Sequence, residues 1–205
     1  MGCDIHGWVE IRPYPKDMMN QENWWNPVIR IDDIVGRNYD MFGLLFGVRN
    51  YANYDAIAEN RGTPEYEEWQ LKNEDESKVL TQEDSEEWGV DGHSHTWMLY
   101  SEIEKIDWEK ETNQVDERIH QYVKQKDGSL KYFCKFSAGG EIDAEDYEQM
   151  KQGKEVVKDK FVFKLEKLKL KDALGDDWQH LFNLMKELAR VRGPENVRLV
   201  VWFDN

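Results

Sequence analysis

The sequence predicts one α+β domain over residues 1–205, with a mixed or antiparallel sheet and helices packed on one face. Three segments carry this prediction. Residues 3–12 alternate apolar and polar side chains, as a strand with one face on a core does. Residues 172–191 repeat apolar side chains at helical spacing. Residues 197–203 form a run that is apolar apart from Arg198, typical of a strand buried on both faces.

In the first strand, Pro13 and Pro15 end the alternation, and Asp4 and His6 share the polar face while Cys3 turns to the core. A loop with a short apolar run at 28–31 follows. The spacing then predicts a helix over 39–48, whose two glycines indicate that another element packs closely against it.

Residues 65–91 contain eleven acidic residues and two lysines, which predicts a solvated insertion, helical around 66–71. An extended segment is expected over 95–100, followed by a helix with Ser101 and Glu104 as a capping box.

Residues 130–136 follow Asp127-Gly128 and predict a hairpin strand, whereas no structure is assigned to 151–171. Gly193-Pro194 should end the long helix before the last strand, which can lie beside the first.

The composition limits the classes of partner. A net charge of −15 disfavours long nucleic acid but leaves room for a small phosphorylated ligand held by converging arginines. Two cysteines fit a reducing, cytoplasmic setting, and no apolar run is long enough for a membrane helix. The nine Trp, nine Tyr and eight Phe residues suit a large core, a pocket for a planar ligand, or the interface of a homodimer.

The histidines form two candidate clusters. Asp4 and His6 project from one strand face, and His93 and His95 would do the same if extended. Together these four side chains would suit a divalent metal such as Zn, Mn or Mg. A metal-free site with Asp4 and with His6 or His95 as general acid and base is the alternative. Hydrogen-bonded structural roles for both clusters also stay open.

A second constellation consists of arginines beside loop-forming residues and aromatic side chains. Arg37, Arg49 and Arg61 each precede or adjoin Asn or Gly, which can present a guanidinium to phosphate. Ordinary ion pairs with the abundant carboxylates are the alternative. The aromatic residues expected to contact a ligand beside Arg49 and Arg61 are Trp24, Tyr54 and Trp97.

Two resemblances bear on function. Asp4-Ile5-His6-Gly7 is similar to the opening motif of calcineurin-like metallophosphoesterases, but the other motifs of that family are absent from the sequence. The segments 1–6, 93–97 and 201–205, with Arg61-Gly62-Thr63-Pro64 and Tyr39-Asp40-Met41-Phe42, resemble an uncharacterised family of small bacteriophage and prophage proteins. That resemblance implies a viral origin and suggests action against host defence.

The leading prediction is therefore a phage-type accessory protein that hydrolyses a phosphodiester or related bond in a small nucleotide or nucleotide signal. The first alternative is a binding protein that sequesters such a signal without chemistry. The second is an inhibitor that blocks a basic protein partner through its acidic stretch.

Overall fold

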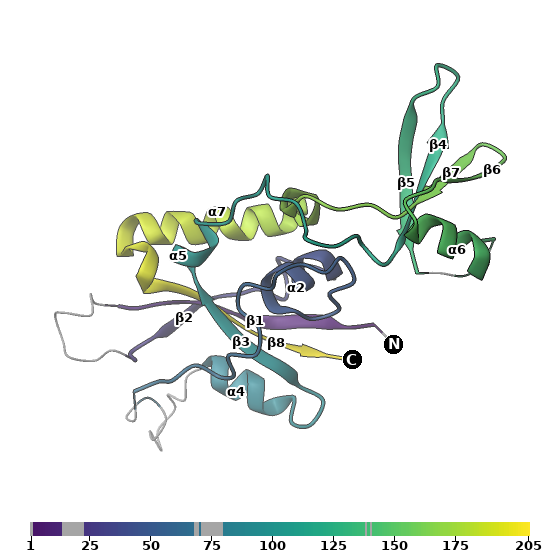
Figure 1. The fold of residues 1–205 in the computed structure, drawn as a ribbon. Coiled ribbons are helices and arrows are strands. Elements are labelled where there is room, and N and C mark those ends of the chain that lie inside the picture. The colour runs from purple at the N-terminus through teal and green to yellow at the C-terminus, as the bar shows by residue number, and fades with distance from the viewer. Residues whose placement is uncertain (1, 14–22, 68–69, 71–79, 138, 140) are drawn as a thin grey trace.

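The computed structural model describes residues 2–13, 23–67, 70, 80–137, 139 and 141–205, and it shows an α+β fold with two antiparallel sheets (Figure 1). The first sheet has the strand order β2-β1-β8-β3. Its strands are β1 (Asp4–Ile11), β2 (Asn26–Arg30), β3 (His93–Leu99) and β8 (Val197–Asp204). The predicted α+β class and antiparallel sheet are confirmed, whereas the division of the strands between two sheets was not expected.

The centre of the first sheet is the antiparallel pair of the first and last strands. β1 runs beside β8 with Asp4 opposite Asp204 and His6 opposite Trp202. All residues of β8 except Asp204 are buried, as the apolar run predicted. The two strands approach closely at Gly7, where an added Cβ would lie 2.1 Å from the Val200 carbonyl oxygen.

One face of this sheet carries the main core. Helices α2 (Tyr39–Phe46) and α7 (Asp176–Arg192) pack against it, and the predicted apolar stripe of α7 is buried apart from half-buried Leu188. Within α2, a Cβ at Gly43 would lie 2.9 Å from the Cα of Asn50. The close approach at this glycine is thus made by the turn that follows the helix, and not by another element as expected.

The opposite face is covered by α4 (Leu80–Glu87) (Figure 1), so helices lie on both faces. Its contacts to the sheet are polar: Trp8 Nε1 donates to Asp84 at 2.8 Å, and Ser85 Oγ hydrogen-bonds to His95 Nε2 at 2.9 Å. This part of the 65–91 stretch is therefore packed on the sheet rather than solvated, because polar side chains of β1 and β3 offer it partners. Of the helix expected at 66–71, residues 68, 69 and 71 lie outside the described part.

The helix after β3 begins earlier than expected. It is α5 (Tyr100–Ile103), and Leu99 precedes it with its backbone N donating to Glu102 Oε2 at 2.9 Å. The predicted capping box of Ser101 and Glu104 is therefore wrong, because the strand ends at Leu99 and Glu102 satisfies the free backbone donor.

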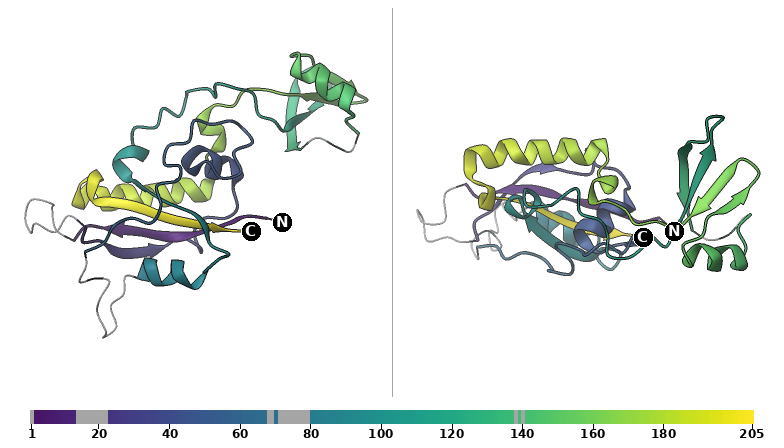
Figure 2. Two further views of the ribbon diagram at one scale, coloured as in Figure 1. Left: turned by 60° about the horizontal axis from the view of Figure 1, so that its bottom comes forward. Right: turned by 45° about the horizontal axis from the view of Figure 1, so that its top comes forward.

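The second sheet has the strand order β5-β4-β7-β6 and its own small core. Its elements are β4 (Ile119–Lys124), β5 (Leu130–Phe136), α6 (Ala144–Lys151), β6 (Val156–Lys158) and β7 (Phe161–Lys164). The predicted hairpin after Asp127-Gly128 joins β4 to β5. Figure 2 shows this sheet standing beside the main body, connected by residues 104–118 and 165–169. Two short 3-10 helices, η1 (Leu170–Ala173) and η2 (Pro194–Asn196), flank α7.

Candidate functional site

Asp4 and His6 lie on the same face of β1, as predicted, but each is already engaged. Asp4 accepts two hydrogen bonds from Arg37, at 2.9 and 2.7 Å, and this ion pair lowers the pKa of the carboxyl. His6 Nδ1 lies 2.7 Å from Asp32 Oδ1, and its Nε2 lies 3.6 Å from Asp204 Oδ1. Burial opposes protonation of His6, but the bond to Asp32 and the two negative charges outweigh it and raise the pKa.

His93 and His95 do not share a face, so that expectation is wrong. The pairing of β3 with β8 is irregular between His93 and Thr96, and Ser94 has a φ of 52°, in the left-handed region. His93 consequently lies against Phe203 and His95 against Trp202, with ring centroids 6.2 and 6.5 Å apart. Successive residues of β8 point to opposite faces, which separates the two imidazoles.

The described residues contain no group of three or more His, Cys, Asp or Glu side chains placed to hold a metal ion. The four predicted ligands are thus not assembled into one cluster in this part of the chain. A divalent metal at Asp4, His6, His93 and His95 stays a prediction.

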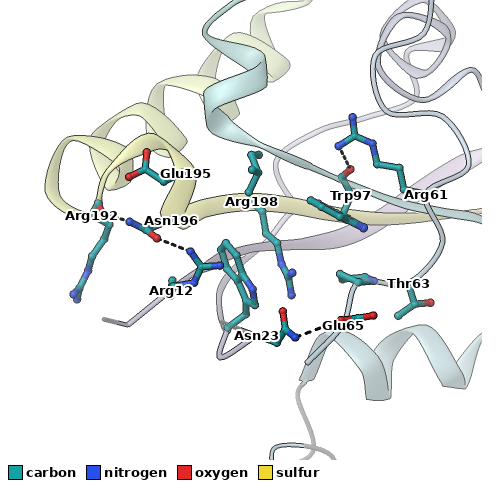
Figure 3. Close-up of a pocket in the computed structure, with 13 residues that line it drawn as sticks. Arg12, Asn23, Arg61, Thr63, Glu65, Trp97, Arg192, Glu195, Asn196 and Arg198 are labelled. Atoms are coloured by element: carbon teal, nitrogen blue, oxygen red, sulfur yellow. Dashed lines mark hydrogen bonds between the residues drawn. The ribbon is translucent and has the colours of Figure 1, made fainter. Parts of the chain in front are cut away.

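A pocket of about 880 Å³ opens at the other end of the first sheet (Figure 3). We call it the arginine–tryptophan cleft. It is lined by Arg12, Asn23, Trp25, Arg61, Thr63, Pro64, Glu65, Trp97, Leu99, Arg192, Glu195, Asn196 and Arg198. Segments far apart in the chain meet here: the end of β1, the residues before β2, the strand β3, and the turn from α7 into β8.

Arg198 is the most buried cation of the cleft, with 3% of its surface exposed. Its guanidinium carbon lies 4.0 Å from the ring centroid of Trp25 and 5.0 Å from that of Tyr66. Its Nε donates to Glu10 Oε2 at 2.7 Å, while its Nη2 has no hydrogen-bond partner among the described residues. A buried guanidinium nitrogen without an acceptor is costly, and the cation–π contacts with Trp25 and Tyr66 offset part of that cost.

Arg61 and Trp97, both predicted to bind a ligand, do line the cleft. Arg61 donates to both carboxylate oxygens of Glu102, at 2.9 and 2.7 Å, and to the carbonyls of Trp97 and Ile57. Its guanidinium carbon also lies 5.3 Å from the Trp97 ring centroid. Because Glu102 balances its charge, Arg61 serves to position Trp97, whose half-buried ring faces the cleft (Figure 3).

The other predicted ligand-binding residues lie outside the lining of the cleft. Trp24 donates from Nε1 to its neighbour Asn26 at 3.2 Å. Tyr54 is buried in the main core, and this burial strongly raises the pKa of its hydroxyl. Arg49 donates to Asn205 at 2.8 Å. These residues were grouped because they are close in sequence, which does not decide whether their side chains reach one cleft. Tyr54, for example, packs in the core.

Sequence reasoning missed Arg12, Arg192 and Arg198 as cleft residues. One signal was present: Arg198 interrupts an otherwise apolar strand run, and a charge on a buried strand needs a compensating group. The position of Arg192 depends on how α7 turns back toward the sheet, which no local pattern indicates.

Comparison with protein-family models, with curated proteins and with solved structures finds no match. Within the described residues, none of the helices combines the length and the apolar character that a membrane crossing requires. The geometry of the cleft is therefore the feature from which a function can be inferred.

Proposed function

We propose that the protein binds a small, planar, anionic ligand of the nucleotide class in the arginine–tryptophan cleft. The observation that carries the proposal is that four arginines line one cleft of a chain whose net charge is −15. Glu102 and Glu10 balance Arg61 and Arg198, so an anion would be held by the other two arginines of the lining, Arg12 and Arg192. Arginine presents several donors in a planar fork, which suits phosphate or carboxylate. A cleft that gathers cations in an acidic protein fits a small anion better than an extended polyanion.

The rim arginines are the ones best placed to hold the anionic group. Arg192 is exposed, donates to the Pro13 carbonyl at 2.8 Å and forms no ion pair with the described residues. The guanidinium carbon of Arg12 lies 4.4 Å from the ring centroid of Trp25, and Arg12 Nη1 donates to Asn196 Oδ1 at 2.8 Å. A phosphate near these two would place an attached ring toward Trp97, which offers a stacking face.

Binding without chemistry is the activity that this geometry supports best. The described lining contains no histidine or cysteine, and its carboxylates, Glu65 and Glu195, are exposed at the rim. Hydrolysis by Asp4, His6 and His95 stays a prediction. Together with the resemblance to phage proteins, the cleft favours sequestration of a nucleotide signal in the cytoplasm of an infected bacterium.

Titration calorimetry against a panel of nucleotides tests the proposal, with the matching uncharged nucleosides and inorganic phosphate as further arms. Nucleotides should bind, nucleosides should bind more weakly, and Arg192→Gln should weaken nucleotide binding by about tenfold. Trp97→Leu should weaken nucleotides and nucleosides alike. The matched control is Arg190→Gln, because Arg190 lies on the same helix, is 75% exposed and pairs with Glu187.

Failure of every nucleotide to bind, or an equal loss in Arg190→Gln, would contradict the proposal. The same incubations, with and without chelator, separate binding from hydrolysis. Unchanged ligand released on heating supports sequestration. Products that disappear in His6→Ala and His95→Ala would instead establish the enzyme and overturn a binding-only function.

A further inference from the structure

The second sheet differs from the rest of the chain in charge. Its strands and hairpin turns, residues 119–136 and 156–164, hold seven lysines and two aspartates, whereas the whole chain has a net charge of −15. The lysines are Lys124, Lys126, Lys131, Lys135, Lys158, Lys160 and Lys164. Over the whole of residues 119–164, nine lysines face eight acidic residues, so the excess of lysines is confined to the strands and hairpin turns. The sheet therefore carries a local positive charge that the overall composition conceals.

Four of these lysines are exposed and form no ion pair with the described residues: Lys124, Lys126, Lys131 and Lys160. The other three are neutralised, Lys135 by Asp40, Lys164 by Glu166 and Lys158 by Asp146. The unpaired group lies on the β4–β5 hairpin and on the turn before β7 that adjoins it. Figure 1 shows this hairpin extending past α6 and away from the main body.

Aromatic and apolar side chains are exposed along the same hairpin. Phe133 is 62% exposed, Tyr132 50% and Leu130 38%. Phe133 is the extra residue in the irregular pairing of β4 with β5, and its ring lies 6.1 Å from that of Phe161. Tyr132 lies on the opposite face of the sheet, with its ring 5.7 Å from that of Tyr122 and 6.3 Å from that of His120. The exposed Phe133 ring, among unpaired lysines, suits a partner with both apolar faces and negative charge.

The arrangement distinguishes between partners of this chemistry. A second copy pairing through β5 would bring the lysines of both edges together, and such lysines ordinarily prevent edge pairing. An anionic membrane fits poorly, because the turn that would enter it is Lys126-Asp127-Gly128-Ser129, with the apolar side chains set back along the strand. Single-stranded nucleic acid fits best, since bases stack on exposed rings while lysines follow the phosphates.

We propose that the β4–β5 hairpin, with Phe133 as the stacking face and Lys124, Lys126, Lys131 and Lys160 as phosphate contacts, binds single-stranded nucleic acid. The net charge predicted no long nucleic acid, but the hairpin projects from the body and exposed charges are screened beyond about 8 Å at physiological salt. A short single strand can thus meet the positive hairpin without crossing the acidic surface. This inference is independent of the arginine–tryptophan cleft.

Fluorescence anisotropy of the full chain with labelled single-stranded DNA and RNA of about 12 nucleotides tests the proposal. Single strands should bind more tightly than the duplex, with log K falling against log salt with a slope of about −2 to −3, for about four phosphate contacts. Phe133→Ala should weaken binding by about tenfold or more. Lys131→Gln should weaken it and reduce the slope by about 0.7.

Controls come from α7, where Leu184 is 44% exposed and Lys186 is also exposed. Leu184→Ala and Lys186→Gln should leave oligonucleotide affinity unchanged, and so should Arg192→Gln in the cleft. No binding at about 50 mM salt would overturn the proposal. The proposal would also be overturned if Lys131→Gln and Phe133→Ala bound oligonucleotides as tightly as the parent does. Binding of anionic vesicles or an acidic peptide without binding of oligonucleotides would overturn it as well.

Discussion

Replacing Asp116 by Asn tests the charged junction between the two sheets. The Asp116 side chain is fully buried and accepts hydrogen bonds from the Arg118 backbone N, Nε and Nη2, at 2.9, 2.8 and 2.7 Å. It also accepts one from His120 Nε2 at 3.0 Å. Arg118 in turn pairs with Asp40 of α2, which ties the second sheet to the main body.

The magnitude follows from the pKa of this carboxyl. Burial alone would raise it, but the bonds from His120 and Arg118 outweigh burial and lower the pKa from 3.8 to about 2. Because the pKa is lower in the folded state, ionised Asp116 stabilises the fold above pH 3.8 by about 2 kcal/mol. This stabilisation is lost as the pH falls through about 2, and about half of it is gone by pH 3.

Urea unfolding followed by circular dichroism at pH 7 and pH 3 is the assay. Asp116→Asn should lower the free energy of unfolding at pH 7 by about 2 to 4 kcal/mol, since it leaves Arg118 and His120 without a buried counter-charge. The difference from the parent should shrink by about 1 kcal/mol at pH 3. Asp55→Asn is the control, because Asp55 is 63% exposed and should cost less than about 0.5 kcal/mol.

The reasoning would be refuted if the free energy of unfolding of Asp116→Asn differed from that of the parent by the same amount at both pH values. It would mean that the substitution acts through packing and that the ionised carboxylate contributes nothing at neutral pH. A loss of equal size in Asp55→Asn would show that the assay reports overall charge.

Two further predictions concern the junction and the first sheet. Burial would lower the pKa of His120, but its two carboxylate partners raise it, so its stabilisation is complete below pH 6.5 and lost as pH rises through the raised value. The free energy of unfolding should fall as the pH rises above 6.5 in the parent, and it should fall less in His120→Gln. Gly7→Ala, with a φ of 154° and a Cβ directed at the Val200 carbonyl, should cost about 3 kcal/mol or more in urea unfolding. Gly128→Ala, at a φ of 86° with open space around it, should cost only about 1 to 2 kcal/mol. Equal losses of unfolding free energy in the two variants would contradict the expected clash at Gly7.

Local periodicity predicted several elements because it reports directly which side of a segment is buried. The alternation over 3–12 gave the correct faces of β1, and the stripe over 172–191 gave the buried side of α7. The apolar run at 197–203 predicted a strand covered on both faces, and Asp127-Gly128 predicted a hairpin. The division into two sheets has no such signal, because it depends on which strands pair across long separations.

The candidate sites show the same limit to what the sequence can predict. The shared face of Asp4 and His6 follows from the sequence by itself, because strand geometry alternates without reference to the rest of the chain. Their partners, Arg37 and Asp32, were decided by tertiary structure. A single left-handed residue, Ser94, was enough to reverse the expected relation of the neighbouring histidines, since a slip of one position moves a side chain to the other face.

The sequence by itself determined the first and last strands and the long helix with the buried side of each, together with the acidic balance that makes clustered cations meaningful. Only the tertiary structure decided that Arg12, Arg61, Arg192 and Arg198 line one cleft beside Trp97. It alone also placed the unpaired lysines on a hairpin that projects from an acidic body (Figure 1). The physical reason is that burial leaves a local pattern in the chain, whereas the convergence of distant side chains depends on strand pairing and helix packing.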